Sequence, residues 1–148
     1  MSDLSHVDPA GSVRMVDVGA KPSSRRRAVA TAKVTTAAAT ARRLRELPKG
    51  DALTTAQLAG IMAAKKTSDL IPLCHPLPLS HVEVSLEVVD DGVEITAAAE
   101  TVAQTGVEME ALVAASVAAL TIYDMAKAID RELVVSYVRL VEKTKEPV

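Results

Sequence analysis

Asp124 and Lys127 have side chains and spacing suited to proton transfer. They are three positions apart in a segment whose apolar pattern predicts a helix, so they share one surface of that helix. A carboxylate and an amine held together can move protons on and off a bound ligand, although an ordinary helical ion pair has the same spacing. Asp124 also shares its stripe with Val113, Val117 and Leu120, which predicts a carboxylate beside a buried apolar face.

A second group of reactive side chains lies in residues 71–79, which hold three prolines in nine residues and therefore form neither a helix nor a central strand. Pro76 forces His75 toward extended geometry, so His75 and Cys74 are presented on a stiff segment. This segment can line a binding site, or it can cross the core with Cys74 packed as a small hydrophobic side chain. A metal site built from Cys74, His75 and His81 is disfavoured, because adjacent ligands are geometrically awkward and no fourth donor has familiar zinc spacing.

Two further sets of charges can serve a site or merely the surface. Glu108 and Glu110 open the long predicted helix, where acidic residues also complement the helix dipole. In a strand, Arg25 and Arg27 point one way and Arg26 the other, so only part of this run can line a site. Basic clusters of this kind most often lie on solvated surfaces.

The elements that must position these residues follow from hydrophobic periodicity. Residues 81–89 alternate apolar and polar side chains, and 90–92 turn the chain into 93–102, which predicts a β-hairpin. One long helix is predicted over 107–129. An antiparallel sheet with helices packed on one face, an α+β fold of the split βαβ type, accommodates this order. The remaining expected elements are strands at 29–35 and 131–141, a helix from Thr35 or Thr36 to Leu47, and a helix at 54–64.

Composition predicts one domain that associates with further copies. The chain has 148 residues, of which 49% are hydrophobic and 24% charged. Ala, Val and Leu supply most of the apolar content, and their small side chains fill a core poorly, so association is expected. Residues 1–24 are expected to form an N-terminal arm with a short strand at 13–18, and residues 142–148 a flexible tail.

The same numbers argue against several classes of protein. A net charge of −2, two tyrosines and no Phe or Trp leave no basic field and little on which bases can stack, so no nucleic-acid partner is expected. The longest nearly uncharged stretch, 111–123, is shorter than the ~20 residues of a membrane span, so no membrane association is expected. The single cysteine and the lack of a signal-peptide pattern favour the cytoplasm.

Longer motifs resemble those of the cyclic pyranopterin monophosphate synthase family, the C protein of molybdenum cofactor biosynthesis. The resemblance extends over residues 4–140, and motifs of this length are far more specific than a short fingerprint. The motifs are residues 15–18, 49–51, 59–61, 70–77, 105–112 and 114–125.

The resemblance implies a ferredoxin-like α+β fold and a homohexamer, a trimer of dimers with sites at the dimer interface. It implies a lyase that converts 3′,8-cyclo-7,8-dihydro-GTP to cyclic pyranopterin monophosphate and releases pyrophosphate, an early step of molybdenum cofactor (molybdopterin) biosynthesis. The implied catalytic residues are Asp124, Lys127 and Lys49, and the implied substrate-binding residues are Leu73, Cys74, His75, Glu108, Met109, Glu110 and Arg26.

Helix arithmetic adds an expectation about how such a site is assembled. Glu110 and Asp124 fall on nearly the same face of the predicted helix but are separated by roughly 21 Å along its axis. One compact ring system cannot touch both ends of that span. We therefore expect the Glu110 end of one copy to meet the Asp124 end of another, in an antiparallel two-fold pairing.

The implied chemistry needs cations but no cofactor. Closing a cyclic phosphate while expelling pyrophosphate requires positive charge around a triphosphate, and the candidates for this task are Lys49, Arg26 and His75. No redox cofactor and no dedicated metal site are expected.

The C-terminus departs from the family pattern. Where the family usually ends in Lys-Ser-Gly-Gly-Lys, residues 143–147 read Lys-Thr-Lys-Glu-Pro, so the second lysine is missing or shifted to Lys145. This departure leaves the fold unaffected but puts full catalytic rate in doubt. The alternative function is a catalytically weak paralogue that binds a nucleotide or pterin as a regulatory module.

Overall fold

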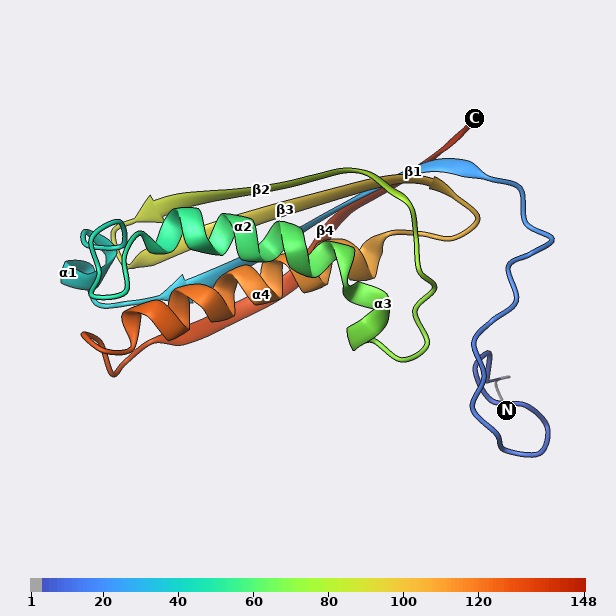
Figure 1. The fold of residues 1–148 in the computed structure, drawn as a ribbon, viewed down its shortest axis with the longest axis horizontal. Helices are drawn as coiled ribbons and strands as arrows, with labels where there is room; N and C mark the ends of the chain where they lie inside the picture. The colour runs from blue at the N-terminus through green and yellow to red at the C-terminus, as the bar shows by residue number, and fades with distance from the viewer. Residues whose placement is uncertain (1–3) are drawn as a thin grey trace.

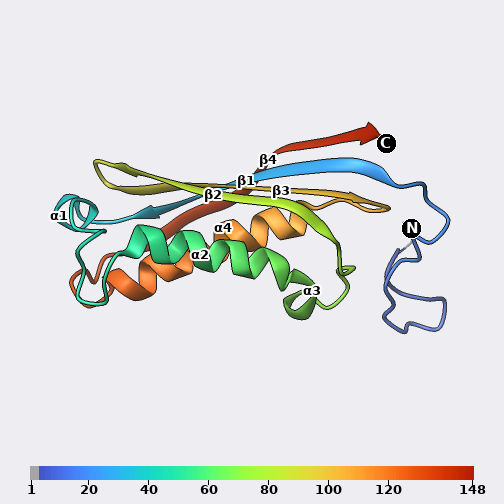
Figure 2. The same ribbon diagram turned by 45° about the horizontal axis from the view of Figure 1, so that its top comes forward.

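A four-stranded antiparallel sheet covered on one face by two helices forms the body of the protein (Figures 1 and 2). The computed structural model describes residues 4–148. The sheet has the strand order β2-β3-β1-β4, which is the ferredoxin-like arrangement predicted from the sequence. In chain order the elements are β1 (Ser24–Thr35), α1 (Ala38–Ala41), α2 (Ala52–Lys65), α3 (Thr67–Leu70), β2 (Leu79–Val89), β3 (Gly92–Ala103), α4 (Glu108–Ala126) and β4 (Val134–Pro147).

Small side chains allow the two layers to approach closely. Alternate residues of β1, namely Ala28, Ala30 and Ala32, are fully buried beneath the helices. Gly60 of α2 lies against α4, where an added Cβ would be 3.0 Å from the carbonyl oxygen of Ala114. α2 and α4 therefore pack almost backbone to backbone over the sheet, and α4 also contacts β1 and β3.

α4 is a core helix despite its apolar composition. Within residues 4–148 it is the one helix long and apolar enough to cross a membrane by length and composition, with a mean hydropathy of 1.4. More than half of that stretch is buried in the fold. Its buried residues face the sheet and α2, as expected for the central helix of an α+β domain.

The structure confirms the predicted hairpin (β2 and β3), the long helix (α4) and the irregular segment at 71–78. The prediction of a helix that extends to Leu47 is wrong. α1 contains only Ala38–Ala41, and turns follow. Leu44 and Leu47 are both buried, and the backbone N–H of Ala52 donates to the carbonyl of Leu44 at 2.8 Å. Burial of these two leucines against the sheet therefore outweighs the helix propensity of an alanine-rich segment.

Both chain ends also differ from expectation. The described part of the arm, residues 4–23, contains no strand at 13–18 but only an isolated bridge between Val7 and Val13. The tail expected at 142–148 is largely strand, because β4 pairs with β1 as far as Pro147 opposite Ser24. The reason is that β1 begins five residues earlier than expected, and its arginine run provides β4 with hydrogen-bonding partners.

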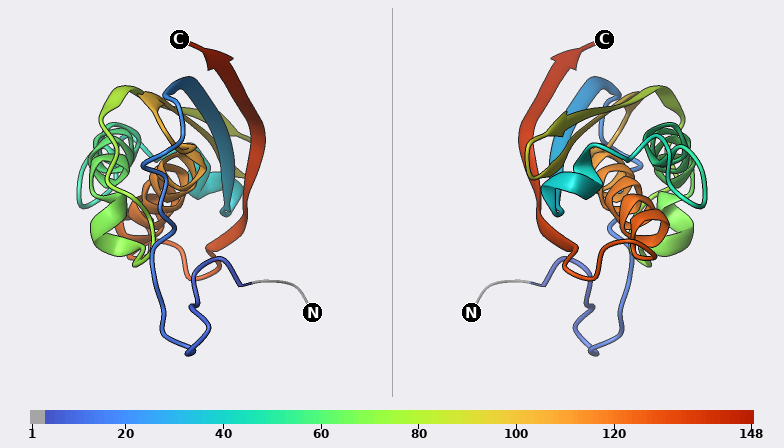
Figure 3. Two further views of the ribbon diagram at one scale, coloured as in Figure 1. Left: turned by 90° about the vertical axis from the view of Figure 1, so that its right-hand side faces the viewer. Right: turned by 90° about the vertical axis from the view of Figure 1, so that its left-hand side faces the viewer.

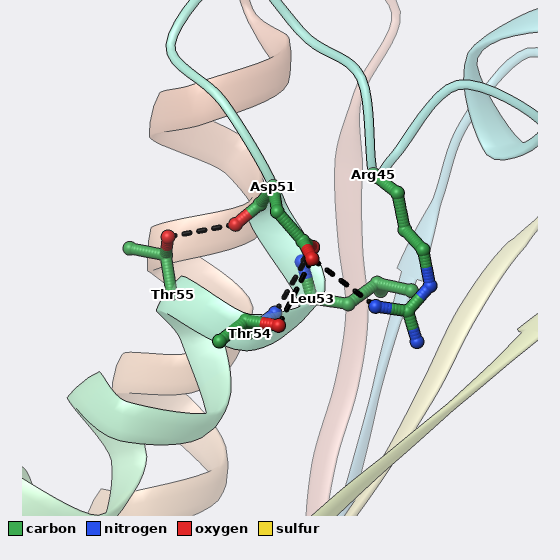
Figure 4. Close-up of polar contacts among 5 residues, drawn as sticks. All are labelled: Arg45, Asp51, Leu53, Thr54 and Thr55. Atoms are coloured by element: carbon green, nitrogen blue, oxygen red, sulfur yellow. Dashed lines mark hydrogen bonds and ion pairs between the residues drawn. The ribbon is translucent and has the colours of Figure 1, made fainter.

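The turn before α2 is fixed by the adjacent residues Gly50 and Asp51, and Figure 4 shows the polar contacts of Asp51. Gly50 has φ +114°, a region that L side chains rarely adopt, and the chain reverses there. Asp51 is the N-cap of α2, and its Oδ1 accepts hydrogen bonds from the backbone N–H groups of Leu53 and Thr54 at 3.0 and 3.1 Å. Arg45 donates to its other oxygen at 3.1 Å. This turn places Lys49 immediately before a capped helix.

Loss of this cap should lower stability. We expect Asp51→Ala to lower the melting temperature by about 3 °C, because two backbone donors lose their acceptor. Asp51→Asn should retain most of the stability at neutral pH, since an amide oxygen still accepts. Thermal denaturation followed by circular dichroism measures both variants.

The pH dependence of the same cap has a defined sign. Hydrogen bonds, chiefly from the backbone N–H of Thr54, hold the pKa of Asp51 below its ordinary value of 3.8. The stabilisation is therefore present above that ordinary value and is lost as the pH falls through the lowered one. The wild type should lose its advantage over Asp51→Asn in acid, and an advantage that is equal at pH 7 and pH 2 would contradict the assignment.

Candidate active site

Asp124 is held between two lysines at the C-terminal end of α4. Lys49 Nζ lies 2.9 Å from Asp124 Oδ2, and Lys127 Nζ lies 3.0 Å from Oδ1. These hydrogen bonds, first from Lys49 and then from Lys127, hold the pKa of the Asp124 carboxyl below its ordinary value. The structure thus brings together the three residues predicted to be catalytic, and it presents an ionised carboxylate with an amine on each oxygen.

Asp124 is more exposed than the sequence predicted. Its side chain is 55% exposed, and Leu120 on the same stripe is 58% exposed. The expectation of a buried stripe is wrong for Leu120 and Asp124, because α4 packs through a different face that consists mainly of alanines together with Ile122 and Met125. Apolar surface nevertheless lies beside the carboxylate, since Tyr123 is 40% exposed.

The opposite end of α4 holds a buried carboxyl group in contact with a thiol. Glu110 is 2% exposed, and the Sγ of Cys74 donates to its Oε2 at 3.7 Å. Its Oε1 is buried and has no hydrogen-bond partner in the structure. Burial raises the pKa of Glu110, and burial together with the negative charge of Glu110 raises the pKa of Cys74 to about 11. Both shifts disfavour the charged form, so the pKa of each group lies above its ordinary value.

Glu108, two residues before Glu110, belongs to a separate charged cluster. Lys143 Nζ on β4 lies 2.6 Å from Glu108 Oε1. Burial raises the pKa of Glu108, but the hydrogen bond from Lys143 and the charge of Arg26 outweigh that effect, so the pKa lies below its ordinary value. Lys145 is opposite Arg26 in the β1/β4 register. Lys143 and Arg26 therefore lie near the first turn of α4, and Lys145 is the strand neighbour of Arg26.

A cavity of about 400 Å³ lies next to these groups. Leu73, Cys74 and His75 line it from the proline-rich segment, and Glu108 and Met109 line it from α4. Every residue predicted to bind substrate therefore lies at this end of the molecule: five line the cavity, Glu110 contacts Cys74, and Arg26 lies near Glu108. The arm and the β3–α4 loop complete the lining with His6, Val16, Val18, Lys21, Thr105 and Gly106.

The contribution of the arm was missed from the sequence. Residues 15–18 were considered only as part of an expected short strand and as one motif of the resemblance, although a motif in an arm rich in loop-forming residues is a signal of a functional role. A metal site receives no support. His81 lies 3.6 Å from Glu83, and no group of three His, Cys, Asp or Glu residues within 4–148 could hold a metal ion.

In one chain the two groups of residues cannot act on the same atoms. Asp124 and Glu110 lie fourteen positions apart on a continuous helix, which separates them by roughly 21 Å. Lys49 joins the Asp124 end, whereas Arg26 and His75 join the Glu110 end, so the three expected phosphate ligands are also divided. Each chain therefore contains two half-sites.

The environment of Cys74 should make its thiol react slowly. Since the thiolate is the reactive form, a pKa of about 11 should leave about 100-fold less thiolate at pH 8 than an unperturbed cysteine has. Iodoacetamide should alkylate the folded protein correspondingly slowly, and Glu110→Gln should recover a several-fold part of the rate by removing a negative charge. Mass spectrometry measures the rates, with the urea-unfolded protein as reference. Equal rates in the folded and unfolded protein would contradict this description.

Comparisons with known proteins agree with this arrangement. The MoaC family matches residues 15–146. A cyclic pyranopterin monophosphate synthase of Roseiflexus sp. (strain RS-1) is 58% identical over 148 residues, covering 97% of this chain and 94% of the relative. Proteins of the same name from Novosphingobium aromaticivorans and Streptomyces coelicolor are each 55% identical, covering 97% and 95% of this chain and 92% and 84% of the relatives. The chain belongs to the MoaC family.

Proposed function

We propose that this protein is a lyase that converts 3′,8-cyclo-7,8-dihydro-GTP to cyclic pyranopterin monophosphate and releases pyrophosphate, in molybdenum cofactor biosynthesis. Relatives at 52–58% identity carry the name of this activity. The observation that carries the proposal is the carboxylate of Asp124 clamped between Lys49 and Lys127. We place the reaction in the cytoplasm, where an earlier reaction on a soluble nucleotide can supply the GTP-derived substrate.

The Asp124 group is suited to the proton transfers of the ring rearrangement. The carboxylate can accept a proton from a sugar hydroxyl or ring nitrogen, and each neighbouring ammonium group can donate one. Both lysines lie within 3.0 Å of Asp124, so the three groups can exchange roles without large movement. Two ammonium groups contact the single carboxylate and lower its pKa, which keeps Asp124 ionised at neutral pH.

The Glu110 end is suited to closing the cyclic phosphate. A sugar hydroxyl oxygen attacks the α-phosphorus, the bond from that phosphorus to the bridging oxygen breaks, and pyrophosphate leaves with the electron pair. The proton of the hydroxyl passes, directly or through water, to the pyrophosphate. Negative charge grows on the equatorial and leaving oxygens, and Arg26, Lys143 and Lys145 can stabilise it. In this proposal Lys145 takes the place of the family's second C-terminal lysine, because the β1/β4 register puts it opposite Arg26.

We further propose that each site combines two chains in a hexamer built as a trimer of dimers. The separation of the half-sites requires a second chain if both serve one ring system. Leu120 and Tyr123 are 58% and 40% exposed on α4 beside Asp124, which supplies apolar area for a two-fold contact. Antiparallel pairing of two α4 helices would bring the Glu110 end of each chain to the Asp124 end of the other.

Substitution of Asp124 tests the catalytic assignment. Asp124→Asn should lower turnover by about 100-fold or more, because the amide cannot accept the proton. The melting temperature should stay nearly unchanged or rise, since exposed ion pairs contribute little to stability. The assay is pyrophosphate release from 3′,8-cyclo-7,8-dihydro-GTP, and Asp69→Asn, on the exposed surface of α3, is the matched control. Ordinary turnover by folded Asp124→Asn would refute the catalytic role. If the wild-type protein binds the substrate but forms no product, the function is that of a regulatory paralogue.

Complementation tests the shared site. Glu110→Ala and Asp124→Ala should each be inactive alone. After the two proteins are dissociated, mixed and reassembled, activity should return, because a heterodimer contains one site with both residues intact. Native mass spectrometry confirms the heterodimers. If heterodimers form and activity does not return, each chain carries its own complete site.

A further inference from the structure

The N-terminal arm lies across the cavity beside Cys74 and His75. Figure 3 (left) shows residues 4–23 running down the end of the molecule, next to the connection that follows α3. The arm contributes Val16, Val18 and Lys21 to the cavity lining. A ligand in this cavity therefore lies between the arm and the body of the protein.

Two hydrogen bonds tie the arm to the body. His75 Nε2 lies 2.6 Å from the backbone carbonyl oxygen of Val16, and Gln104 Nε2 donates to the carbonyl oxygen of Gly19 at 3.2 Å. Within residues 4–148, the other hydrogen bonds of the arm stay inside the arm, as in the turns closed by Asp8 and Asp17. The arm thus has a local shape of its own but few attachments, which is typical of a segment that opens independently of the fold.

The contact with Val16 determines which nitrogen of His75 carries a proton. A carbonyl oxygen can only accept, so the ring nitrogen facing it must be Nε2–H. In the neutral ring the other nitrogen, Nδ1, is then unprotonated. The structure gives His75 Nδ1 no partner within residues 4–148.

We propose that residues 13–21 of the arm form a strap over the cavity, latched by the Val16 carbonyl on His75, which holds the ring as Nε2–H and leaves Nδ1 to face the ligand. The strap also brings the ammonium group of Lys21 to the cavity lining. Its ligand is the phosphate-bearing substrate, so this part of the inference rests on the proposed function. His75 has a positioning role in holding the strap, in addition to any contact with substrate.

The strap provides a way for substrate to enter a cavity that the arm then covers. Opening costs only two hydrogen bonds and the contacts of a few apolar side chains, whereas α4 and the sheet stay in place. Closure then covers the bound ligand and strengthens its interactions with the charged groups around Glu108. Segments that open at low cost are drawn from regions with few attachments, as the arm is.

Limited proteolysis tests the latch without any substrate. Trypsin can cleave the arm after Arg14, which is exposed, but not after Lys21, because Pro22 follows. His75→Leu removes the donor to Val16 and should speed cleavage after Arg14 by about five- to tenfold. His75→Gln keeps an N–H donor and should leave the rate near that of the wild type. Cleavage after Arg131, in the exposed α4–β4 connection, is the internal control for global unfolding.

A second variant keeps the test decisive. Gln104→Ala removes the Gly19 anchor at an exposed position and should also accelerate cleavage after Arg14 alone. An unchanged rate in Gln104→Ala and His75→Leu would overturn the latch. Equal acceleration at Arg131 would overturn it too, because the effect would then be global loss of stability.

Nitrogen-15 spectra of labelled histidine test the proton position directly. The chain has three histidines, so single His→Gln variants at His6 and His81 assign the signals. Neutral His75 should show one fixed form, with a slowly exchanging proton on Nε2, whereas exposed His81 should average between tautomers. An averaged or Nδ1–H form at His75 would overturn the proposal. Neither experiment uses turnover, so failure here with normal product formation would refute the strap and leave the proposed function standing.

Discussion

α4 packs against β1, β3 and α2 through side chains that are mostly no larger than a methyl group. Close approach of three backbones gives each small side chain many neighbours and leaves little space within the layer. Ile122 and Met125 add larger apolar side chains to this buried face, whereas Leu120 and Tyr123 are exposed. Asp124 lies near one end of α4 and Glu110 near the other, so the length of this helix sets the distance between the two half-sites.

The two ends of α4 differ in electrostatic environment although both carry carboxylates. Asp124 is exposed and clamped between cations, so its charged form is favoured. Glu110 is buried with an unpartnered oxygen, and burial raises its pKa above the ordinary value. Two carboxyl groups whose pKa values are pushed in opposite directions can take opposite roles in proton transfer. A site that joins these ends across two chains would place a carboxyl group with a lowered pKa beside one with a raised pKa.

The sequence predicted those features that depend on local pattern. The hairpin of β2 and β3, the span of α4 and the irregular proline segment follow from periodicity of two, periodicity of 3.6 and the chemistry of proline. It mispredicted features that depend on burial by distant segments. The segment after α1 is not helical, and Leu44 in it is buried. Asp124 is exposed because other residues of α4, mainly alanines, form the face that packs against the rest of the protein. The role of the arm was missed because its contacts with His75 and Gln104 cross 59 and 85 residues of chain.

The C-terminal strand shows how a sequence departure changes the state of a charged side chain. A tail rich in glycine keeps its lysines mobile, since glycine favours the unfolded chain. Residues 143–147 lack glycine, and β4 continues along β1 to Pro147. Lys143 is consequently fixed on Glu108 at 2.6 Å, and Lys145 is held in register with Arg26 before any ligand arrives. Such preorganised cations lose less entropy on meeting a phosphate, but they cannot follow it through a large movement. In this protein, therefore, closing over a bound ligand falls to the N-terminal arm rather than to the C-terminus.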